Sequence, residues 1–355
     1  MFLMSMSAMA ANKIYVTQAG ASLVFDVLQD GDGNKIGNST TASTADGSAT
    51  NFNIDQVGNS NIITFDIHGD TFTGVFSLTG NSNDIDFNCD SANNTSGCDD
   101  VAATIIFEGN SANVDLDIGL SASGDNADVD IVGASGTDST VVAATIDGTS
   151  AILRLTIAGD TNNYLIDIDG NGDVNGHTLI MTQTGITADV DVVQSGSYDN
   201  IATVTTTGDS QNLDINQTAG GTITLVSTGS TAAAVKTINI SQTGHATFVT
   251  AGDGLNGAGG SFVVTQTASG GSISLDQNGA SANININQTA AATATLDLDG
   301  ASGTYDIDQL NASTLTLTQD GADANYVISQ TGGTGDTVVI TQNGATADVD
   351  IIQRD

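Results

Sequence analysis

One segment of the sequence has residue types and spacing that match part of a calcium-binding loop. Asp167, Asp169 and Asn171 occupy alternate positions in DIDGNGDVN, as oxygen ligands do in the first half of an EF-hand loop. The twelfth position of such a loop is Thr178, where a bidentate Glu is needed, and no flanking helices are expected. A corner of a repeat fold is therefore the favoured interpretation, with calcium at these three residues as the alternative.

Motifs for enzymatic catalysis are missing from the chain. The three histidines, His68, His177 and His245, lie far apart in sequence, and paired carboxylates carry no information among 41 acidic residues. There is no Ser nucleophile elbow, zinc motif or phosphate-binding loop. With no Trp and only 4% aromatic residues, little is available to stack on a sugar ring. The sequence predicts a protein that is not an enzyme and has no cofactor, apart from calcium or other divalent cations.

Two cysteines, Cys89 and Cys98, flank the polar segment DSANNTSG. A local disulfide that closes one loop is one interpretation, and it implies exposure to an oxidising environment. Two free thiols are the other. A metal site needs more ligands than this loop offers.

The charge is strongly acidic, with 41 Asp and Glu against 5 Lys and Arg and a net charge of −36. Binding to nucleic acid or to an anionic membrane surface is excluded, because both need a basic surface. No run of 18 apolar residues predicts a transmembrane helix. The acidic residues alternate with aliphatic ones, as in 113–118 and 347–352, so a solvated outer face is expected. A ladder of carboxylates that binds divalent cations diffusely is the alternative.

The elements that carry these residues are expected to be short strands. Thr, Val and Ile favour strands, whereas Gly, Asn and Asp favour turns. A Gln follows strand after strand, in steps of 10 to 12 residues or of about twice that, at Gln18, Gln29, Gln56, Gln183, Gln194, Gln217, Gln242, Gln266, Gln277, Gln288, Gln309, Gln319, Gln330, Gln342 and Gln353. A unit of about eleven residues cannot bury its own apolar face, so coils must stack on one another.

The predicted fold is therefore all-β. It is a β-solenoid of strand-turn-strand coils of about 22 residues, with two facing parallel sheets and a thin core of Val, Ile and Leu. Gln and Asn side chains at matching positions are expected to form amide ladders along the stack. The chain contains no Pro, as central strands require.

One elongated solenoid is expected over 12–355. Its repeats are regular over 12–61, diverged with insertions over 62–180, and regular again over 181–355. Segments 37–51, 88–101 and 251–261 are rich in turn residues and are expected to bulge out as loops. Residues 1–11 are expected to form a tail or leader remnant, since Ala8-Met9-Ala10 is similar to a signal-peptidase site.

The repeat resembles the curlin repeat of bacterial curli subunits, whose pattern is strand, Gln-x-Gly-x-x-Asn, strand, Gln. Gln56-Val-Gly58-Asn-Ser-Asn61 matches position for position. Partial matches begin at Gln18, Gln242 and Gln319, and Gln277-Asn-Gly279-Ala-Ser-Ala-Asn283 matches with one extra residue. The resemblance covers 12–61 and 181–355 and implies a curlin-like solenoid.

Two kinds of protein carry such repeats. The start Ala11-Asn-Lys-Ile-Tyr-Val-Thr-Gln18 is similar to curlin-repeat structural proteins of marine tailed phages, and the irregular coils favour a component of fixed length. The resemblance thus implies a structural protein of the virion. The alternative is a secreted, extracellular curli-type subunit of a biofilm fibre. Association with copies or other structural subunits is expected through terminal strands and side loops.

Runs such as Thr203-Val-Thr205-Thr-Thr207 and Leu315-Thr-Leu-Thr318 are similar to the Thr arrays of ice-binding surfaces. A flat array requires the same Thr pair on successive coils, and Asp, Ser and Asn interrupt these runs in the sequence. Ordinary strand threonine is the expectation.

Overall fold

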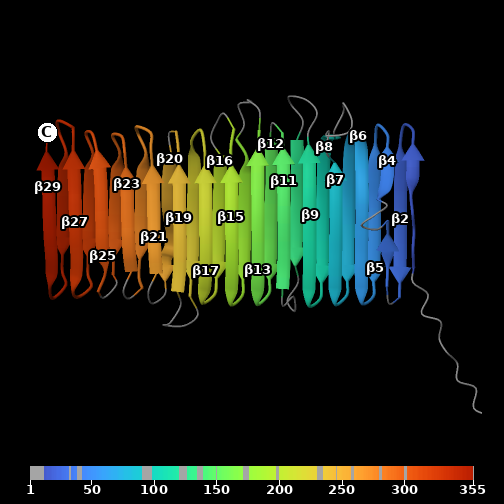
Figure 1. Ribbon diagram of the computed structural model, residues 1–355, viewed down its shortest axis with the longest axis horizontal. Helices are drawn as coiled ribbons and strands as arrows, with labels where there is room; N and C mark the ends of the chain where they lie inside the picture. Colours follow the sequence, from blue (N-terminus) through green and yellow to red (C-terminus); the bar gives the residue numbers. More distant parts are fainter. Residues whose placement is uncertain are drawn as a thin grey trace, which may run out of the picture.

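The chain winds into a β-solenoid, which confirms the predicted all-β fold (Figure 1). The computed structural model describes residues 12–354 outside a set of short gaps. The described residues form 29 strands and no helix. The gaps are 32, 38–41, 90–97, 120–125, 134–138, 149, 171–175, 197–199, 230–234, 245, 257–259, 280–281 and 300–301.

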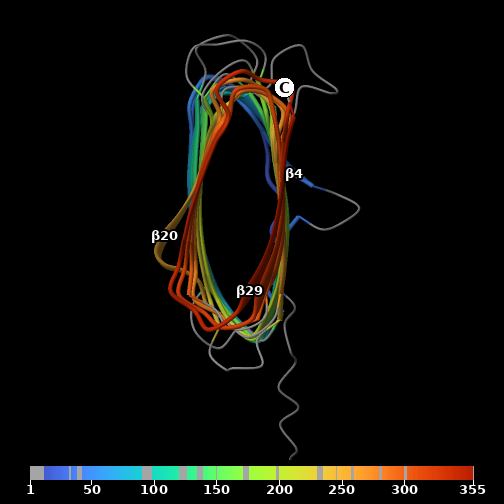
Figure 2. The same cartoon turned by 90° about the vertical axis from the view of Figure 1, so that its left-hand side faces the viewer.

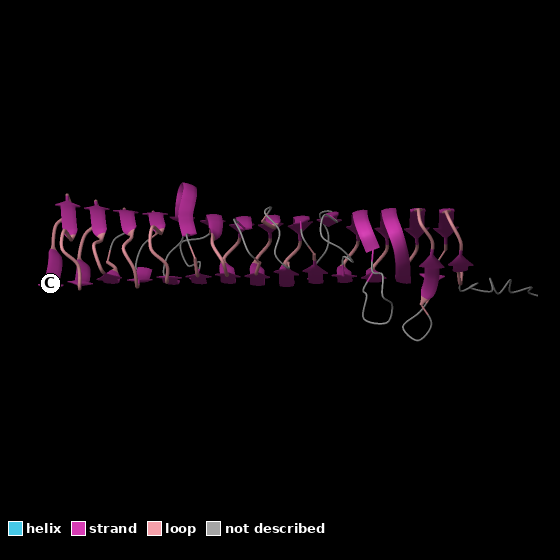
Figure 3. Cartoon of the chain, turned by 90° about the horizontal axis from the view of Figure 1, so that it is seen from above, coloured by secondary structure: helices cyan, strands magenta, loops and turns pink. Residues whose placement is uncertain are grey.

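The strands form two parallel sheets that face each other. End-on they are the long sides of a flattened coil (Figure 2), and from above they form two rows (Figure 3). Sheet A contains β1 (Thr17–Ala19), β3 (Lys35–Ile36), β4 (Ser43–Asp46), β7 (Ser82–Cys89), β9 (Ser111–Gly119), β11 (Ser139–Asp147), β13 (Thr161–Asp169), β15 (Thr187–Gln194), β17 (Ser210–Gln217), β19 (Val235–Gln242), β21 (Gly260–Gln266), β23 (Ala282–Gln288), β25 (Thr304–Leu310), β27 (Ala324–Thr331) and β29 (Ala347–Arg354). Sheet B contains β2 (Leu23–Asp30), β5 (Thr50–Val57), β8 (Cys98–Glu108), β10 (Asn126–Gly133), β12 (Ser150–Ala158), β14 (Thr178–Thr184), β16 (Asn200–Thr207), β18 (Gly221–Thr228), β20 (Ala246–Asn256), β22 (Ser272–Gln277), β24 (Thr293–Leu298), β26 (Thr314–Gln319) and β28 (Thr337–Gln342). The long strand β6 (Ser60–Thr79) rounds a corner, and pairs with β7 by its first half and with β8 by its second.

The stack keeps its register through the diverged middle. Strands β9, β11 and β13 pair residue for residue in sheet A, and β8, β10 and β12 do so in sheet B. Part of the expected loop at 37–51 is in fact strand β4, which pairs with β1 and β6. Likewise β20 extends to Asn256 inside the expected loop at 251–261, where its pairing with β22 shifts register.

The core consists of inward side chains at every second position of each strand, as alternation requires. Val, Ile and Leu fill most of it, as predicted, but not its first third. There Phe25, Phe52, Phe65, Phe72 and Phe87 form an edge-to-face and tilted ring cluster with centroids 4.6 to 6.3 Å apart. The register of the strands thus brings these five rings together in one region of the core, while other aromatic residues, such as Tyr164, Tyr305 and Tyr326, are buried farther along it.

Candidate functional site

An amide ladder runs along sheet A through the C-terminal half of the solenoid. The side chain of each Gln donates from Nε2 to Oε1 of the Gln on the preceding coil, at 2.7 to 3.0 Å, over sequence steps of 21 to 25 residues. The ladder consists of Gln194, Gln217, Gln242, Gln266, Gln288, Gln309, Gln330 and Gln353. All but Gln353 are almost fully buried.

A carboxamide is suited to this position because it has one acceptor and two donor hydrogens. One hydrogen bonds along the stack, and the other bonds across the corner to the first residues of the next strand. For example, Gln266 Nε2 donates to Ser272 O at 3.2 Å, and Gln288 Nε2 donates to Thr293 O at 3.3 Å. The same side chain therefore links neighbouring coils and ties sheet A to sheet B.

The other predicted ladder residues do not join this chain of bonds. Gln29 and Gln56 bond to each other in sheet B at 2.6 Å. Leu298 separates Gln277 from Gln319 in register. Accordingly, Gln277 and Gln319 donate to glycine carbonyl oxygens of their own turns. Gln18 donates to Gly20 O in the same way. The side-chain amide atoms of Gln183 are buried without hydrogen-bond partners, and Gln342 is exposed on β28. The amide ladders expected from sequence are wrong for these five, and the register places residues other than Gln beside Gln18, Gln183 and Gln277.

A shorter asparagine ladder, of the kind expected from sequence, lies at the N-terminal end. Asn12 donates to Asn34 at 3.0 Å, Asn34 to Asn61 at 3.4 Å, and Asn61 to Asn83 at 3.0 Å. Its signal in the sequence is the last position of Gln-x-Gly-x-x-Asn, which begins a strand of sheet A. This ladder fastens the first coils on the opposite corner from the glutamine ladder.

A buried lysine in the core is a feature that was not predicted from the sequence. Lys236 on β19 is 5% exposed, and its Nζ donates to the backbone oxygen of Ser227 on the facing sheet. Burial lowers the pKa of Lys236 to about 8, against a smaller opposing effect of Asp209. On the preceding coil the register places Gln211, whose side-chain amide atoms are buried without partners. This corner of the core is polar and poorly satisfied.

The two cysteines are joined by a disulfide between the end of β7 in sheet A and the start of β8 in sheet B. Both sulfur atoms belong to the core, since Cys89 and Cys98 are 0% exposed. The bond therefore links the two sheets covalently at a corner. Cys89 occupies the position that Ile118 fills on the next coil.

We expect replacement of both cysteines by Ala to lower the free energy of unfolding by about 2–3 kcal/mol, from the loop-closure entropy of a bridge of this size. The separation of the pair is 9 residues. Thermal unfolding with and without a reductant measures the effect. The wild type should lose stability in the reductant while the double variant is unaffected; an equal response of both proteins contradicts the prediction.

The calcium candidates do not assemble into a site among the described residues. Asp167 and Asp169 lie on the outer face of β13, and Asn171 lies outside the described residues. In the part of the chain that the structure describes, no three His, Cys, Asp or Glu side chains form a metal-ligand group. Burial, then Asp169 and Asp147, raise the pKa of Asp167. Calcium binding here stays a prediction.

Outer carboxylates are partly separated by amides. Burial, followed by Asp115, Asp84 and Asp66, raises the pKa of Asp86. On the neighbouring column Asn113 Nδ2 donates to Asp84 at 2.9 Å. Similar Asn-to-Asp bonds connect Asn212 with Asp189 and Asn53 with Asp26. An amide between two acidic coils thus reduces the like-charge contact, and diffuse cation binding stays a prediction.

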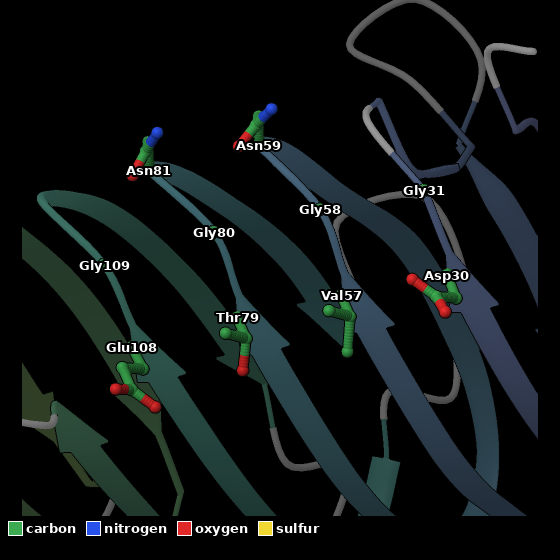
Figure 4. A pocket seen from close by; sticks show the side chains of 10 residues that line it. All are labelled: Asp30, Gly31, Val57, Gly58, Asn59, Thr79, Gly80, Asn81, Glu108 and Gly109. Carbon is green, nitrogen blue, oxygen red and sulfur yellow. The ribbon is translucent and has the colours of Figure 1, made fainter. Parts of the chain in front are cut away.

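A shallow groove of about 470 Å³ follows the turns after β2, β5, β6 and β8 (Figure 4). Its floor is glycine backbone: a Cβ on Gly58, Gly80 or Gly109 would lie only 1.5 to 2.4 Å from the carbonyl oxygen of the preceding turn. Asp30 and Glu108 stand at opposite ends, and Asn59 and Asn81 point away from the strands (Figure 4). The groove is a consequence of close-stacked corners and brings no acid–base pair together.

Comparisons with known proteins found no match to this chain. No protein-family model matches it. No curated protein and no solved structure matches it either. Among the described residues, no helix is long and apolar enough to cross a membrane.

Proposed function

We propose that the protein is a non-enzymatic structural component, a rigid acidic rod that is built into a larger extracellular assembly through contacts with copies of itself or other subunits. The supporting observation is the continuous two-sheet stack with its amide ladder. Backbone bonds, a buried core and ladders run in the same direction, so the fold stabilises length rather than a cleft. No nucleic acid or membrane partner is proposed, on the grounds of charge.

The outermost described coils suit contact with another copy. On β29 the inward positions Val349, Ile351 and Gln353 follow Tyr326, Ile328 and Gln330. At the other end, Gln18 occupies the same column of sheet A as Gln353 when the register is followed from strand to strand, and Gln29 shares the column of Gln342 in sheet B. A second copy stacked on β28 and β29 would therefore place its Gln18 next to Gln353 in sheet A and its Gln29 next to Gln342 in sheet B.

A pair of variants tests this contact. Ile351 and Ile352 are adjacent on β29 and similarly exposed, at 43% and 37%, but the register directs Ile351 inward and Ile352 outward. We expect Ile351→Lys to abolish end-to-end association, because it places an unpaired charge in the joint, whereas Ile352→Lys should retain it. Sedimentation of the full chain in near-seawater salt measures this, and equal behaviour of the two variants contradicts it.

The assembly itself is proposed to be a phage virion, on the resemblance to phage curlin-repeat proteins and the irregular coils. The matched outer coils favour the alternative, an open-ended curli-type fibre. Electron microscopy of the purified chain, with a thioflavin assay, separates them. Short particles that never elongate support the virion component; unlimited thioflavin-positive fibres support the curli-type fibre; a dispersed monomer that resists association under all salts contradicts self-assembly.

A further inference from the structure

The outer face of sheet B in the C-terminal half carries an array of two neighbouring columns whose side chains hold hydroxyl and methyl groups and no charge, and β20 bulges outward beside it (Figure 2). It spans β14, β16, β18, β20, β22, β24, β26 and β28. The register aligns its first outward column as Thr178, Ile201, Thr222, Thr247, Ser272, Thr293, Thr314 and Thr337, and its second as Ile180, Thr203, Thr224, Val249, Ser274, Thr295, Thr316 and Val339. We call these sixteen residues the Thr face.

The sequence predicts that Asp, Ser and Asn interrupt the Thr runs; in these two columns Ser does so at Ser272 and Ser274, but no Asp or Asn occurs. Asp276 and Asp297 occupy the third outward column and lie in register with each other beside the array. Positions without Thr hold Ser, Val or Ile, so nearly every position keeps either a hydroxyl or a β-branched shape. Variable turn lengths hide this alignment in the sequence, because coils differ in length while strands stay in register.

The Thr face is regular in two directions. Neighbouring coils are about 4.8 Å apart, and alternate residues along a strand are about 6.6 Å apart. Eight coils therefore extend the array over roughly 34 Å. β-Branched side chains have restricted χ1 angles, so the threonine hydroxyls hold a repeated position. Within the first column, Ser272 Oγ donates to Thr247 Oγ1 at 3.4 Å.

The absence of charge from the Thr face is a separate observation. The protein has a net charge of −36, and the facing sheet A carries outward Asp189, Asp191, Asp306 and Asp308 over the same coils. Sheet B itself carries Asp128, Asp130 and Arg154 on its earlier strands β10 and β12. The two columns of the Thr face are thus free of charge over eight coils, whereas Asp276 and Asp297 lie in the third outward column of the same sheet.

We propose that the Thr face binds the surface of an ice crystal. A partner that matches one unit repeated in two directions must itself be a two-dimensional lattice, and water molecules on the prism faces of hexagonal ice repeat at distances close to both spacings of the array. Methyl groups order the first water layer, and hydroxyls bond into it. A charged side chain would hold water in a geometry that ice lacks. This proposal does not depend on the assembly to which the rod belongs.

A second copy packed on the same face is the main competing occupant. Each copy would bring a charge of −36 toward the other, repelling it within the screening distance of about 8 Å at physiological salt. A dry joint would also bury the hydroxyls of both arrays, each of which then needs a partner. Ice supplies those partners, so we assign the face to ice.

The test is ice shaping and thermal hysteresis of the full chain by nanolitre osmometry, with partition into a growing ice front. The wild type should shape ice crystals into faceted forms and produce thermal hysteresis, a gap between the melting and freezing temperatures. Thr295→Lys, in the centre of the Thr face, should lose most of that gap. Thr265→Lys is the matched control: it places the same charge on a half-buried outward strand threonine of sheet A and should keep the gap.

Three results overturn the proposal. They are no gap and no ice partition by the wild type, equal loss in both variants, and a wild-type dimer in sedimentation that Thr295→Lys dissociates. The last result assigns the face to a second copy. Circular dichroism of each variant, with unfolding midpoints like the wild type, shows that the solenoid is intact. Because Ile351→Lys leaves the Thr face unchanged, its effect on association is read independently of ice binding.

Discussion

Replacing Gln266 with Leu should lower the free energy of unfolding by about 3 kcal/mol, because it leaves a buried acceptor without a donor. Gln266 is in the interior of the glutamine ladder, donating to Gln242 and accepting from Gln288 at 3.0 and 2.9 Å. After the change, Gln288 still has the backbone oxygen of Thr293, whereas Oε1 of the buried Gln242 loses its ladder donor. The volume is kept, so little of the loss is a cavity.

Gln194→Leu is the matched control for this prediction. Gln194 is the first member of the ladder, and the preceding coil has Ile168 at the same register position. Its replacement removes the bond to Ile201 O, as Gln266→Leu removes the bond to Ser272 O, so the two variants share that loss. Unlike Gln266→Leu, it leaves no ladder oxygen without a donor, and Gln217 keeps carbonyl oxygens of Asn200 and Thr222 at 3.4 and 3.5 Å. Thermal unfolding and amide hydrogen exchange at the affected coils measure both variants. Equal losses in the two would show that position in the ladder is unimportant.

Lys236→Met should raise stability at pH 7 and remove a pH dependence. The pKa of Lys236 is lowered to about 8 in the folded chain, whereas in the unfolded chain this lysine has its ordinary pKa near 10.5. The folded state therefore binds fewer protons between these values, so wild-type stability is lower below pH 8 and rises as the pH increases toward 10. The gain in the variant at pH 7 should be about 2 kcal/mol, once solvent screening of the ammonium is allowed for.

Denaturant unfolding between pH 7 and pH 10 measures this slope. Above pH 10 the buried tyrosines interfere: burial raises the pKa of Tyr305 to about 12, and stability then falls as tyrosines of the unfolded chain ionise. Lys13→Met removes the same charge from an exposed position and is the control. An unchanged slope in Lys236→Met, or the same gain in both variants, contradicts the assignment.

Local pattern was enough to predict the fold. Alternation of aliphatic and polar residues has a period of two within one strand, and a Gln at the strand end followed by Gly marks the corner, as at Gln56 and Gly58. These signals need only a few neighbouring residues. The coil of about 22 residues and the two parallel sheets follow from them.

Long-range register could not be read in the same way. Whether Gln277 meets another Gln depends on Leu298, which is 21 residues away and beyond a turn of variable length. The strand β4 was hidden in an expected loop, because its residues Ser43–Asp46 lack a strong aliphatic alternation. Lys236 and the Thr face were missed for the same reason: what decides each is the residue on the next coil, not the residue next in sequence.

The glutamine ladder also gives the rod a direction. In every bond of the ladder the later coil donates and the earlier coil accepts. The amide dipoles therefore add instead of cancelling, and an oxygen leads at the Gln353 end. Because the interior of the rod has this direction, its two ends differ chemically. A growing array of copies would therefore lengthen at unequal rates at its two ends. A subunit inserted in the reverse direction would break the line of aligned dipoles.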